Sequence, residues 1–314
     1  IEIPDWADLT VMLPKEHEEK TATEEEIVLD ALAHPIGSGL LGDEISKGDR
    51  VCILTNDITR LTRSHIYIPI LVEELNRIGI PDEDITILFA NGMHSGMSED
   101  QMISLITEDV YRRVRVCQHD CVNSPCELVG TTSYGHEVWA NQIAMAADKL
   151  ILTGGILVHH MAGFGGGRKD IIPGCARKDT ILNNHKMVVD PNAQAGVLEK
   201  NPVHLDFMEA CAFTKPAFLL NVLCDDHGTI YEAVAGHWRD AYLHGTEMAR
   251  ELYLYPVRER PDVVIASCGG FPKDIDLRQR KKGFYNASRA VKQGGAVFCL
   301  REWRAGCSQE MDDP

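Results

Sequence analysis

The sequence is poor in several features, and each shortage excludes a class of protein. It holds no run of about 18 or more apolar residues, so it predicts no membrane-spanning helix. Basic residues are scarce: 31 Lys and Arg stand against 47 Asp and Glu, which gives a net charge of −16. Nucleic acid is therefore not an expected partner, since its phosphates would meet like charge. A small anionic substrate is compatible, because a few inward-pointing cations can make a local site positive.

Paired C-x-x-C spacings are also missing among the 10 cysteines. The nearest group, Cys117, Cys121 and Cys126, does not match a zinc ribbon, so free or partly buried thiols are favoured over a structural metal. Cysteines spread along a whole chain are typical of a reducing compartment, and we expect a cytoplasmic protein.

What is present is ordinary globular composition in a long chain. The 314 residues are 44% apolar and 25% charged, enough for a sizeable core. The length is about twice the commonest domain size of roughly 150 residues. Two domains, or one large α/β unit with an appendage, are therefore expected.

Short apolar runs rich in β-branched residues alternate with helical segments and end at glycine, asparagine or another polar turn. This pattern is typical of a mostly parallel sheet in an α/β fold. The predicted strands are 50–56, 85–90, 149–153, 217–223, 263–267 and 294–300, and the predicted helices are 66–78 and 98–106, the second capped by Ser98. Because ligands bind beyond the carboxyl ends of such strands, a site is expected within 56–60, 91–94 and 154–170.

Two prolines, Pro256 and Pro261, flank a charged stretch ahead of a new strand and indicate a domain boundary. We expect a larger N-terminal domain over residues 1–257 that carries the sheet, and a second, smaller α/β domain over 258–314. About 55 residues are marginal for an independent core, so the second domain is expected to be minimal or truncated at the C-terminus.

The segment 159–174, HHMAGFGGGRKDIIPG, carries the densest chemical signal. Its glycines leave backbone that an anion or a flat ring can approach, and Lys169 follows them. A Walker loop and a dinucleotide fingerprint are both excluded, because Arg168 stands where each requires glycine. A tight turn packed against a helix is the structural alternative for the same glycines.

Three histidines, His94, His159 and His185, lie at predicted strand ends or close to this loop. A single histidine is usually structural, but three around a glycine–lysine loop indicate acid–base or metal chemistry. Neighbouring residues on a strand face opposite sides, so His159 and His160 are not expected to enter one site, and we assign His159.

Asp57, Thr59 and Arg60 follow the first predicted strand. They offer a carboxylate, a hydroxyl and a guanidinium fork suited to a substrate carboxylate. A helix N-cap formed by Asp57 or Thr59 is the structural alternative, and it is compatible with binding.

Taken together, these motifs resemble the nickel-pincer lactate racemase family. The resemblance spans about residues 50 to 300 and rests on separated motifs in one order. They are Asp57-x-Thr59-Arg60, Asn91-Gly92-x-His94, His159-x-x-Ala162-Gly163-Phe164-x-Gly166-Gly167-x-Lys169, Pro173-Gly174, Asn184-His185, and Gly269-Gly270-x-Pro272-x-Asp274 with Gln279-x-x-Lys282.

The resemblance implies an isomerase with a nickel-pincer nucleotide, a pyridinium mononucleotide whose two thiocarbonyl sulfurs hold nickel, and maturation enzymes that supply it. It implies a covalent link at Lys169, a nickel ligand at His185 and acid–base roles for His94 and His159. The remaining implied contacts are Asp57, Thr59, Gly166, Gly167 and Gln279 for the cofactor, and Arg60 and Lys282 for the substrate carboxylate.

Elementary chemistry agrees with that implication. Removing the C2 hydrogen of a 2-hydroxy acid as a proton would place a carbanion beside a carboxylate, whereas moving it as hydride to an electron-poor ring avoids this. The hydroxyl proton must leave as well, and two histidines can exchange base and acid roles between enantiomers. We therefore expect a racemase or epimerase of a 2-hydroxy acid, with the second domain closing over the site.

Two departures from the family pattern bear on the substrate. Gly165 stands where the family has serine, so one hydroxyl contact is lost. Arg278 stands where the lactate enzymes tend to have tyrosine, and a guanidinium there favours a second carboxylate or several hydroxyls. The substrate is thus lactate-like, malate-like or a sugar acid, unless Arg278 belongs to a solvated helix face.

Two other functions stay open at this stage. One is a nicotinamide-dependent 2-hydroxy acid dehydrogenase, which is disfavoured because no G-x-G-x-x-G follows a strand. The other is a non-catalytic nickel or cofactor carrier, since the first-domain motifs alone could hold the cofactor.

Overall fold

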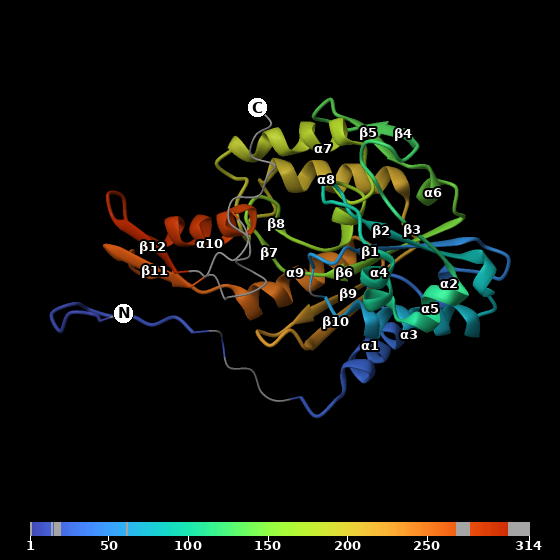
Figure 1. Ribbon diagram of the computed structural model, residues 1–314, viewed down its shortest axis with the longest axis horizontal. Helices are drawn as coiled ribbons and strands as arrows, with labels where there is room; N and C mark the ends of the chain where they lie inside the picture. The colour runs from blue at the N-terminus through green and yellow to red at the C-terminus, as the bar shows by residue number, and fades with distance from the viewer. Residues whose placement is uncertain (1, 14, 16–19, 61, 268–276, 301–314) are drawn as a thin grey trace.

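A computed structural model shows an α/β fold built around a six-stranded sheet (Figure 1). The structure describes residues 2–13, 15, 20–60, 62–267 and 277–300, and for 277–282 only the backbone. The strands, in their spatial order, are β10 (Ile230–Gly236), β9 (Phe218–Cys224), β6 (Lys149–Gly155), β1 (Val51–Asn56), β2 (Ile85–Ala90) and β3 (Arg115–Gln118). All neighbours pair in parallel except β10, which is antiparallel to β9. The predicted mostly parallel α/β sheet is confirmed.

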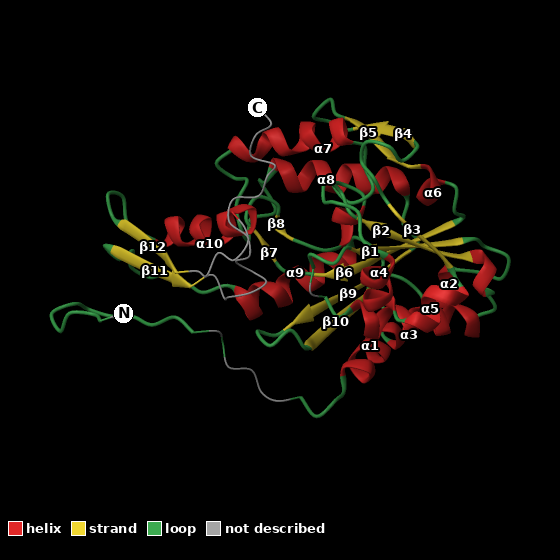
Figure 2. Cartoon of the chain, viewed as in Figure 1, coloured by secondary structure: helices red, strands yellow, loops and turns green. Residues whose placement is uncertain are grey.

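Side chains of the strands alternate between two hydrophobic cores, one on each face of the sheet. In β1, Val51 and Ile53 enter one core, whereas Cys52 and Leu54 enter the other. Helices α1 (Glu24–Ala33), α2 (Leu41–Glu44), α3 (Ser64–Arg77), α4 (Glu99–Ile106) and α5 (Glu108–Arg113) contribute to the first core. Helices α6 (Gln142–Met145), α7 (Lys178–His185), α8 (Pro202–Thr214) and α9 (Asp240–Tyr253) contribute to the second, which makes three layers (Figure 2).

Burial on both faces explains why the central strands are mostly apolar. Ile53 and Leu54 are adjacent, face opposite sides, and are both completely buried. Complete burial of such a side chain contributes about 1.5–3 kcal/mol, so both faces of β1 favour apolar residues at these positions. This is the sequence pattern of a strand covered by helices on both sides.

Predicted and observed elements agree closely in the centre of the sheet. The strand predicted at 85–90 is β2 with the same bounds, and α4 begins after Ser98, whose hydroxyl accepts the backbone N–H of Gln101. Strands β3 and β10, and the antiparallel hairpin of β4 (Cys126–Thr131) and β5 (Glu137–Asn141), were not predicted.

Residues 263–300 contain a separate small sheet. Strands β11 (Val263–Ser267) and β12 (Ala296–Leu300) pair in parallel, and α10 (Leu277–Ala290) packs against both. Tyr285 of α10 reaches the larger part of the chain, where its hydroxyl donates to the carbonyl of Ala193 at 3.3 Å. The division into domains 1–257 and 258–314 stays a prediction.

Strand order reverses between β1 and β6, since β2 and β3 extend from β1 in one direction while β6 and β9 extend in the other. Ligand crevices of open α/β sheets lie at such a switch point, beyond the carboxyl ends of the strands. The segments 57–60, 91–94 and 156–170 begin at that edge, after β1, β2 and β6. The fold thus brings together the three segments that the sequence indicates.

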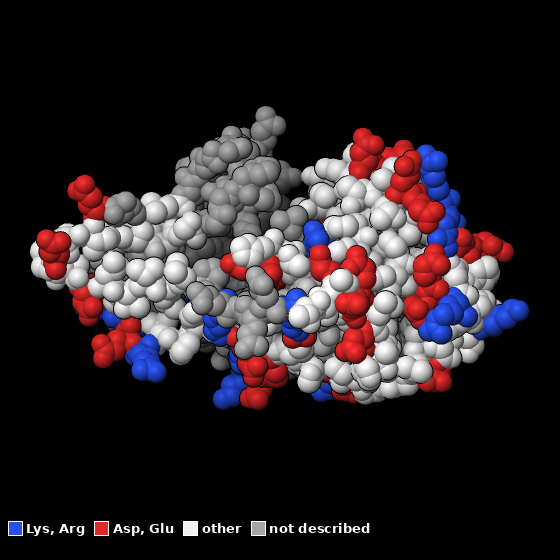
Figure 3. All heavy atoms as spheres, turned by 90° about the horizontal axis from the view of Figure 1, so that it is seen from below, with Lys and Arg blue, Asp and Glu red and all other residues white. Residues whose placement is uncertain are grey.

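The surface agrees with the charge count. Acidic side chains are prominent over much of the face shown in Figure 3. Among the described residues, no helix combines the length and apolar character needed to cross a bilayer.

Candidate active site

Beyond β1 and β2, His94 and Asp57 form a hydrogen-bonded pair. Nδ1 of His94 lies 2.9 Å from Oδ2 of Asp57, and the hydroxyl of Thr59 lies 3.4 Å from the same nitrogen. Asp57 is almost completely buried, whereas the His94 side chain keeps 28% of its surface exposed. The carboxylate therefore holds one nitrogen of a ring whose other edge reaches solvent.

The charge of Asp57 determines which His94 nitrogen is available. Burial alone would raise the pKa of the Asp57 carboxyl, but the hydrogen bond and charge of His94, with the bonds from Thr59, hold the pKa below its ordinary value. An ionised carboxylate only accepts, so Nδ1 of His94 carries the proton that it shares with Asp57. Nε2 of neutral His94 then has a lone pair and can act as a base.

Asp57 does not cap a helix, contrary to the structural alternative considered from the sequence. Its Oδ1 accepts the backbone N–H of Thr59 at 2.7 Å and closes a local turn. Helix α3 begins only at Ser64, after Arg63 in a left-handed conformation. The turn places the carboxylate beside His94.

Backbone contacts hold the turn that carries His94. The N–H of His94 donates to the carbonyl of Asn91, whose side-chain amide donates to Gln118 of β3. The N–H of Gly92 donates to the carbonyl of Gly174 at 2.9 Å. The turn after β2 is thus attached to the chain that follows Lys169, which brings two of the predicted segments together.

Across the switch point, His159 meets Lys169. Nε2 of His159 lies 3.0 Å from Nζ of Lys169, and Nδ1 of His159 accepts the backbone N–H groups of Met161 and Ala162. The predicted juxtaposition of these two side chains is present in the structure.

The expectation that His159 and His160 face opposite sides is wrong. Strand β7 (Val158–His159) ends at His159, and the chain turns before β8 (Gly163–Phe164), so strand alternation no longer applies at His160. The two rings stack with centroids 4.6 Å apart and an angle of 28° between their planes. His160 also lies edge-on to Tyr285 of α10, with ring centroids 5.9 Å apart.

His185, the last residue of α7, is kept neutral. Burial and the charges of Lys169 and His160 lower the pKa of His185 to about 4, so its imidazole carries no charge at neutral pH. Asn184 beside it is completely buried and donates to Oδ2 of Asp206 on α8 at 2.8 Å, which fixes this end of the helix. A neutral imidazole on a fixed helix end is what a metal ligand requires.

Glycines of β8 and of the loop that follows it are explained by protein packing. A Cβ on Gly163 would lie 2.4 Å from the carbonyl oxygen of Val197, and one on Gly166 would lie 2.7 Å from Oδ1 of Asn221. Gly163, Gly166 and Gly167 all have positive φ angles. Gly166 and Gly167 are buried, so the tightly packed turn is observed, and their contact with a cofactor stays a prediction.

Arg168 supports this loop from inside the protein. Its guanidinium is completely buried and donates to the carbonyls of Ala162, Phe164, Gly165 and Gly166 at 2.9–3.2 Å. The planar fork satisfies several loop carbonyls at once, which the flexible ammonium of lysine cannot do.

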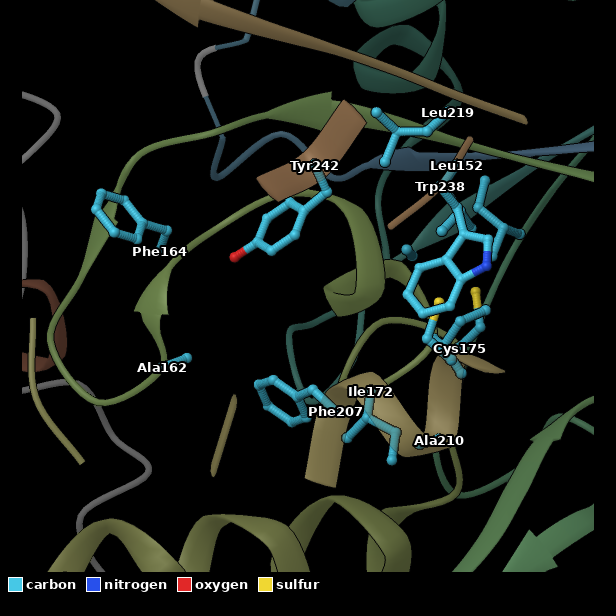
Figure 4. Packing of buried hydrophobic residues seen from close by; sticks show 14 of the residues in the cluster. Leu152, Ala162, Phe164, Ile172, Cys175, Phe207, Ala210, Leu219, Trp238 and Tyr242 are labelled. Atoms are coloured by element: carbon cyan, nitrogen blue, oxygen red, sulfur yellow. The ribbon is translucent and has the colours of Figure 1, made fainter. Parts of the chain in front are cut away.

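The other contacts of Arg168 complete its surroundings. It donates to Nδ1 of His204, and burial together with the Arg168 charge lowers the pKa of that histidine to about 2. The guanidinium lies 4.4 Å from the ring centroid of Tyr242 and 5.8 Å from that of Phe207. These rings and Phe164 project from α9, α8 and β8 into one core (Figure 4).

Arg60 and the second-domain residues complete the predicted set. Arg60 is half-buried, and within the described part of the chain its guanidinium makes no hydrogen bond or ion pair. It is therefore suited to an incoming anion. The motif 269–274 and the side chains of Arg278, Gln279 and Lys282 lie outside the described residues.

Metal chemistry at this site would depend on an added group. Over the described ranges, no three His, Cys, Asp or Glu side chains are grouped closely enough to hold a metal ion. Among the described cysteines, Cys117, Cys121 and Cys126 are free thiols. A nickel ion at His185 would thus need donors from a cofactor, and the nearby Lys169 offers an amine for its attachment.

Sequence reasoning missed three residues. His160 was excluded because neighbouring residues of a strand face opposite sides, but the strand ends at His159. Arg168 was considered only as the residue that excludes a Walker loop and a dinucleotide fingerprint. Tyr285 gives no local signal. The doublet His159-His160 before a glycine loop could have indicated that both rings are close together, because strands commonly end ahead of such loops.

Fold and site together define an α/β enzyme with paired histidines and a lysine at the switch point of its sheet. Residues 1–196 match the family described as the lactate racemase N-terminal domain. A lactate racemase from Thermoanaerobacterium thermosaccharolyticum is 38% identical over 288 residues, covering 90% of this chain and 67% of that protein. A lactate racemase from Lactiplantibacillus plantarum is 33% identical over 304 residues, covering 93% and 71%.

Solved structures agree with these relatives. The lactate racemase apoprotein from Thermoanaerobacterium thermosaccharolyticum superimposes with a TM-score of 0.88 at 37% identity, over 92% of this chain and 69% of that one. A Thermotoga maritima protein has a TM-score of 0.70 at 20% identity, over 90% and 72%, which shows the fold alone. The chain belongs to the lactate racemase family, and it is an isomerase.

Proposed function

We propose that this isomerase racemises a 2-hydroxy carboxylate, with lactate as the first substrate to test, using a nickel-pincer nucleotide attached to Lys169. Both curated relatives are lactate racemases at 33–38% identity, which supports the substrate class. A malate-like or sugar-acid substrate is the alternative that Arg278 favours, because a second carboxylate would complement its charge.

The observation that carries the proposal is the complementary protonation of two histidines. His94 shares its Nδ1 proton with Asp57 and leaves Nε2 as a base. His159 accepts backbone N–H groups at Nδ1, so its neutral ring carries the proton on Nε2 and can donate a hydrogen bond to a substrate oxygen. A racemase needs one ring that takes the hydroxyl proton on one side and a second ring that, once protonated, returns a proton on the other side.

Residues of this chain fit the proposed cofactor. Lys169 supplies the amine for the covalent link, and the neutral imidazole of His185 supplies one nickel ligand, since sulfur donors with imidazole suit square-planar nickel. When bound, such a nucleotide supplies an electron-poor ring that takes the C2 hydrogen with its electron pair and returns it. Thr59, Gly166 and Gly167 are the further cofactor contacts that we propose, with Gln279 from the second domain.

Substrate binding is assigned to cations at the rim. The half-buried Arg60 is available to pair with the substrate carboxylate, and Lys282 would add a second cation from α10. Two cations would hold the carboxylate while His94 withdraws the hydroxyl proton. Water exclusion would protect the transient 2-keto acid from release.

Closure by the second domain is supported by two contacts of Tyr285. Its ring lies edge-on to His160, and its hydroxyl donates to the carbonyl of Ala193. These contacts bring α10 beside the histidine cluster. We therefore divide the chain at residues 257 and 258, with the second domain closing over the site.

A direct test uses the protein produced together with the maturation enzymes that make the cofactor. Intact mass and nickel content first establish loading, and chiral chromatography then follows each enantiomer of lactate and malate. We expect loaded protein to interconvert the enantiomers of one acid and unloaded protein to interconvert none. A loaded protein that leaves every 2-hydroxy acid unchanged would instead be a cofactor carrier, and the proposed activity would be wrong.

A further inference from the structure

Helix α8 presents two neighbouring side chains to the end of α7. Asp206 accepts the side-chain amide of Asn184 at 2.8 Å, and the ring of Phe207 lies beside that of His185, with centroids 6.3 Å apart and 57° between the planes. The amide of Asn184 also donates to the carbonyl of Val203 at 3.2 Å, three residues before Asp206. One turn of α8 thus holds both of the last two residues of α7.

The ring of His185 depends on this support, because no other side chain bonds its inner nitrogen. Nδ1 of His185 is buried and, within the described residues, has no side-chain partner. The backbone carbonyl beside the ring is that of Ile181, which belongs to the same helix. The ring therefore moves with the last turn of α7, so whatever fixes Asn184 also fixes the direction in which His185 points.

Asp206 is completely buried, and three side chains approach its two carboxyl oxygens. Besides Asn184 at Oδ2, the hydroxyl of Thr132 donates to Oδ1 at 2.6 Å, and Nδ1 of His136 lies 3.3 Å from the same oxygen. A buried carboxyl group is costly unless it is hydrogen-bonded, and an apolar residue of similar volume would pack here without that cost. What the carboxyl group adds is a fixed geometry, because each oxygen has its own donor.

Thr132 and His136 belong to the turn between β4 and β5, and this turn is attached to α8 a second time. The hydroxyl and the backbone N–H of Ser133 donate to the carboxylate of Glu209, three residues after Asp206. In the described part of the chain, this second attachment makes no hydrogen bond to α7. The bond to Asn184 and the attachment of the hairpin can therefore be removed separately.

We propose that Asp206 is a positioning residue for His185, acting through Asn184, and that it holds the imidazole in the direction required of a nickel ligand. The inference rests on the proposed function, in which His185 binds the nickel of the cofactor. Removing a group that orients a metal ligand typically weakens metal binding by about 10- to 100-fold. Asp206 acts in this way through the neighbouring residue, by fixing the end of α7.

The first test uses the full chain without cofactor and the probe diethyl pyrocarbonate, which modifies neutral imidazole nitrogen. Peptide mass mapping gives the modification rate at the partly buried His185 and at the exposed His244 of α9 in one sample at pH 7. Asn184→Ala removes the bond between α7 and Asp206, so local opening should raise the His185 rate at least about fivefold. Asp206→Leu should have the same effect by removing the other partner. The His244 rate should stay unchanged in both.

Three further variants separate positioning from general loosening. Glu209→Ala removes the second attachment between α8 and the hairpin, and it should leave both histidine rates unchanged. Asp206→Asn keeps an oxygen for Asn184 and an amide that the Thr132 hydroxyl can accept, so the His185 rate should stay within about twofold of wild type. Combining Asn184→Ala with Asp206→Leu should add little to either change alone, because both remove one bond.

The second test uses protein loaded by the maturation enzymes, with the adduct at Lys169 verified by intact mass. EDTA is added as a competing chelator, and elemental analysis follows the nickel that stays with the protein. Asn184→Ala and Asp206→Leu should lose nickel at least about tenfold faster than wild type and than Glu209→Ala, while the adduct mass stays the same.

Three results would overturn the inference. The first is a His185 modification rate that neither Asn184→Ala nor Asp206→Leu alters, and the second is a rise of equal size in Glu209→Ala. The third is nickel loss at the wild-type rate from the loaded variants. If Asp206→Leu does not fold, Asn184→Ala decides alone. Failure of the proposed function is distinguishable, because His185 rates that change as expected, in a protein that neither takes up nickel nor racemises any acid, would remove the function and keep the positioning role.

Discussion

Asp57→Asn is the change that most directly tests whether Asp57 makes His94 a base. The carboxylate, with 5% of its side chain exposed, lies 2.9 Å from Nδ1 of His94. Asparagine keeps the shape but removes the charge, and its amide can donate to Nδ1. A donor there favours the tautomer with the proton on Nε2, which is no longer a base.

The size of the effect follows from the geometry. Two unit charges about 4 Å apart attract by about 4 kcal/mol at an effective dielectric constant of about 20. Because 28% of the His94 side chain is exposed, solvent screens part of this attraction. About 1.4 to 2.8 kcal/mol of attraction between the carboxylate and the positive charge that develops on the ring in the transition state then remains, or roughly 10- to 100-fold in rate. Loss of a positioned general base adds to this, so kcat should fall at least about 100-fold.

Two assays separate the parts of this prediction. Nitrogen-15 NMR of the His94 ring distinguishes a protonated from an unprotonated nitrogen, and it needs no activity. Racemisation rates of loaded protein, with loading verified by intact mass, give kcat and KM. Asp30→Asn is the matched control, since Asp30 and His34 form an exposed pair at 3.1 Å whose loss should change neither readout. A variant Asp57→Asn that retains Nδ1 protonation and a rate within threefold of wild type would refute the reasoning.

Three further changes address the loop and its supports. Gly163→Ala should lower the free energy of unfolding by about 3 kcal/mol, because φ is +76° and the Cβ would lie 2.4 Å from the carbonyl oxygen of Val197. The control Gly165→Ala should lower it by less than about 1 kcal/mol. Equal urea midpoints of the two variants would contradict this. Arg168→Met should cost about 3–5 kcal/mol, because the loop carbonyls lose their donors, and an unchanged melting temperature would contradict it. Burial raises the pKa of the folded Asp170 carboxyl well above its unfolded value, so its contribution to stability falls as pH rises above about 4. Relative to wild type, Asp170→Asn should therefore gain stability by up to about 1.4 kcal/mol per pH unit as pH rises. Urea unfolding in which the stability difference between variant and wild type is the same at pH 5 and at pH 8 would exclude this.

The centre of the fold was predictable because its strands are buried on both faces. Most positions in β1 and β2 are buried and apolar, so the run itself marks the strand. Strand β3, at the edge, contains Arg115 and Gln118 and lacks such a run. Strand β10 is interrupted between Ile230 and Glu232, where the register shifts, and this breaks the alternation that a sequence pattern would require.

The site was predictable as a set of segments but not as a set of contacts. His94, His159 and Lys169 were expected because strand ends of a parallel sheet share one edge. The tautomers were not predictable, because they depend on Asp57 at His94 and on two backbone N–H groups at His159. Burial of Arg168 could not be predicted either, since arginine is rarely buried and its partners here are carbonyls that have no sequence signature.

The central claim is that the C2 hydrogen leaves with its electron pair and returns to the same carbon. The most direct measurement supplies cofactor-loaded protein with one enantiomer of lactate deuterated at C2, in ordinary water, and analyses the opposite enantiomer by chiral chromatography and mass spectrometry. We predict a product that retains deuterium at C2. A product that carries solvent hydrogen at C2, or no product at all, would contradict it.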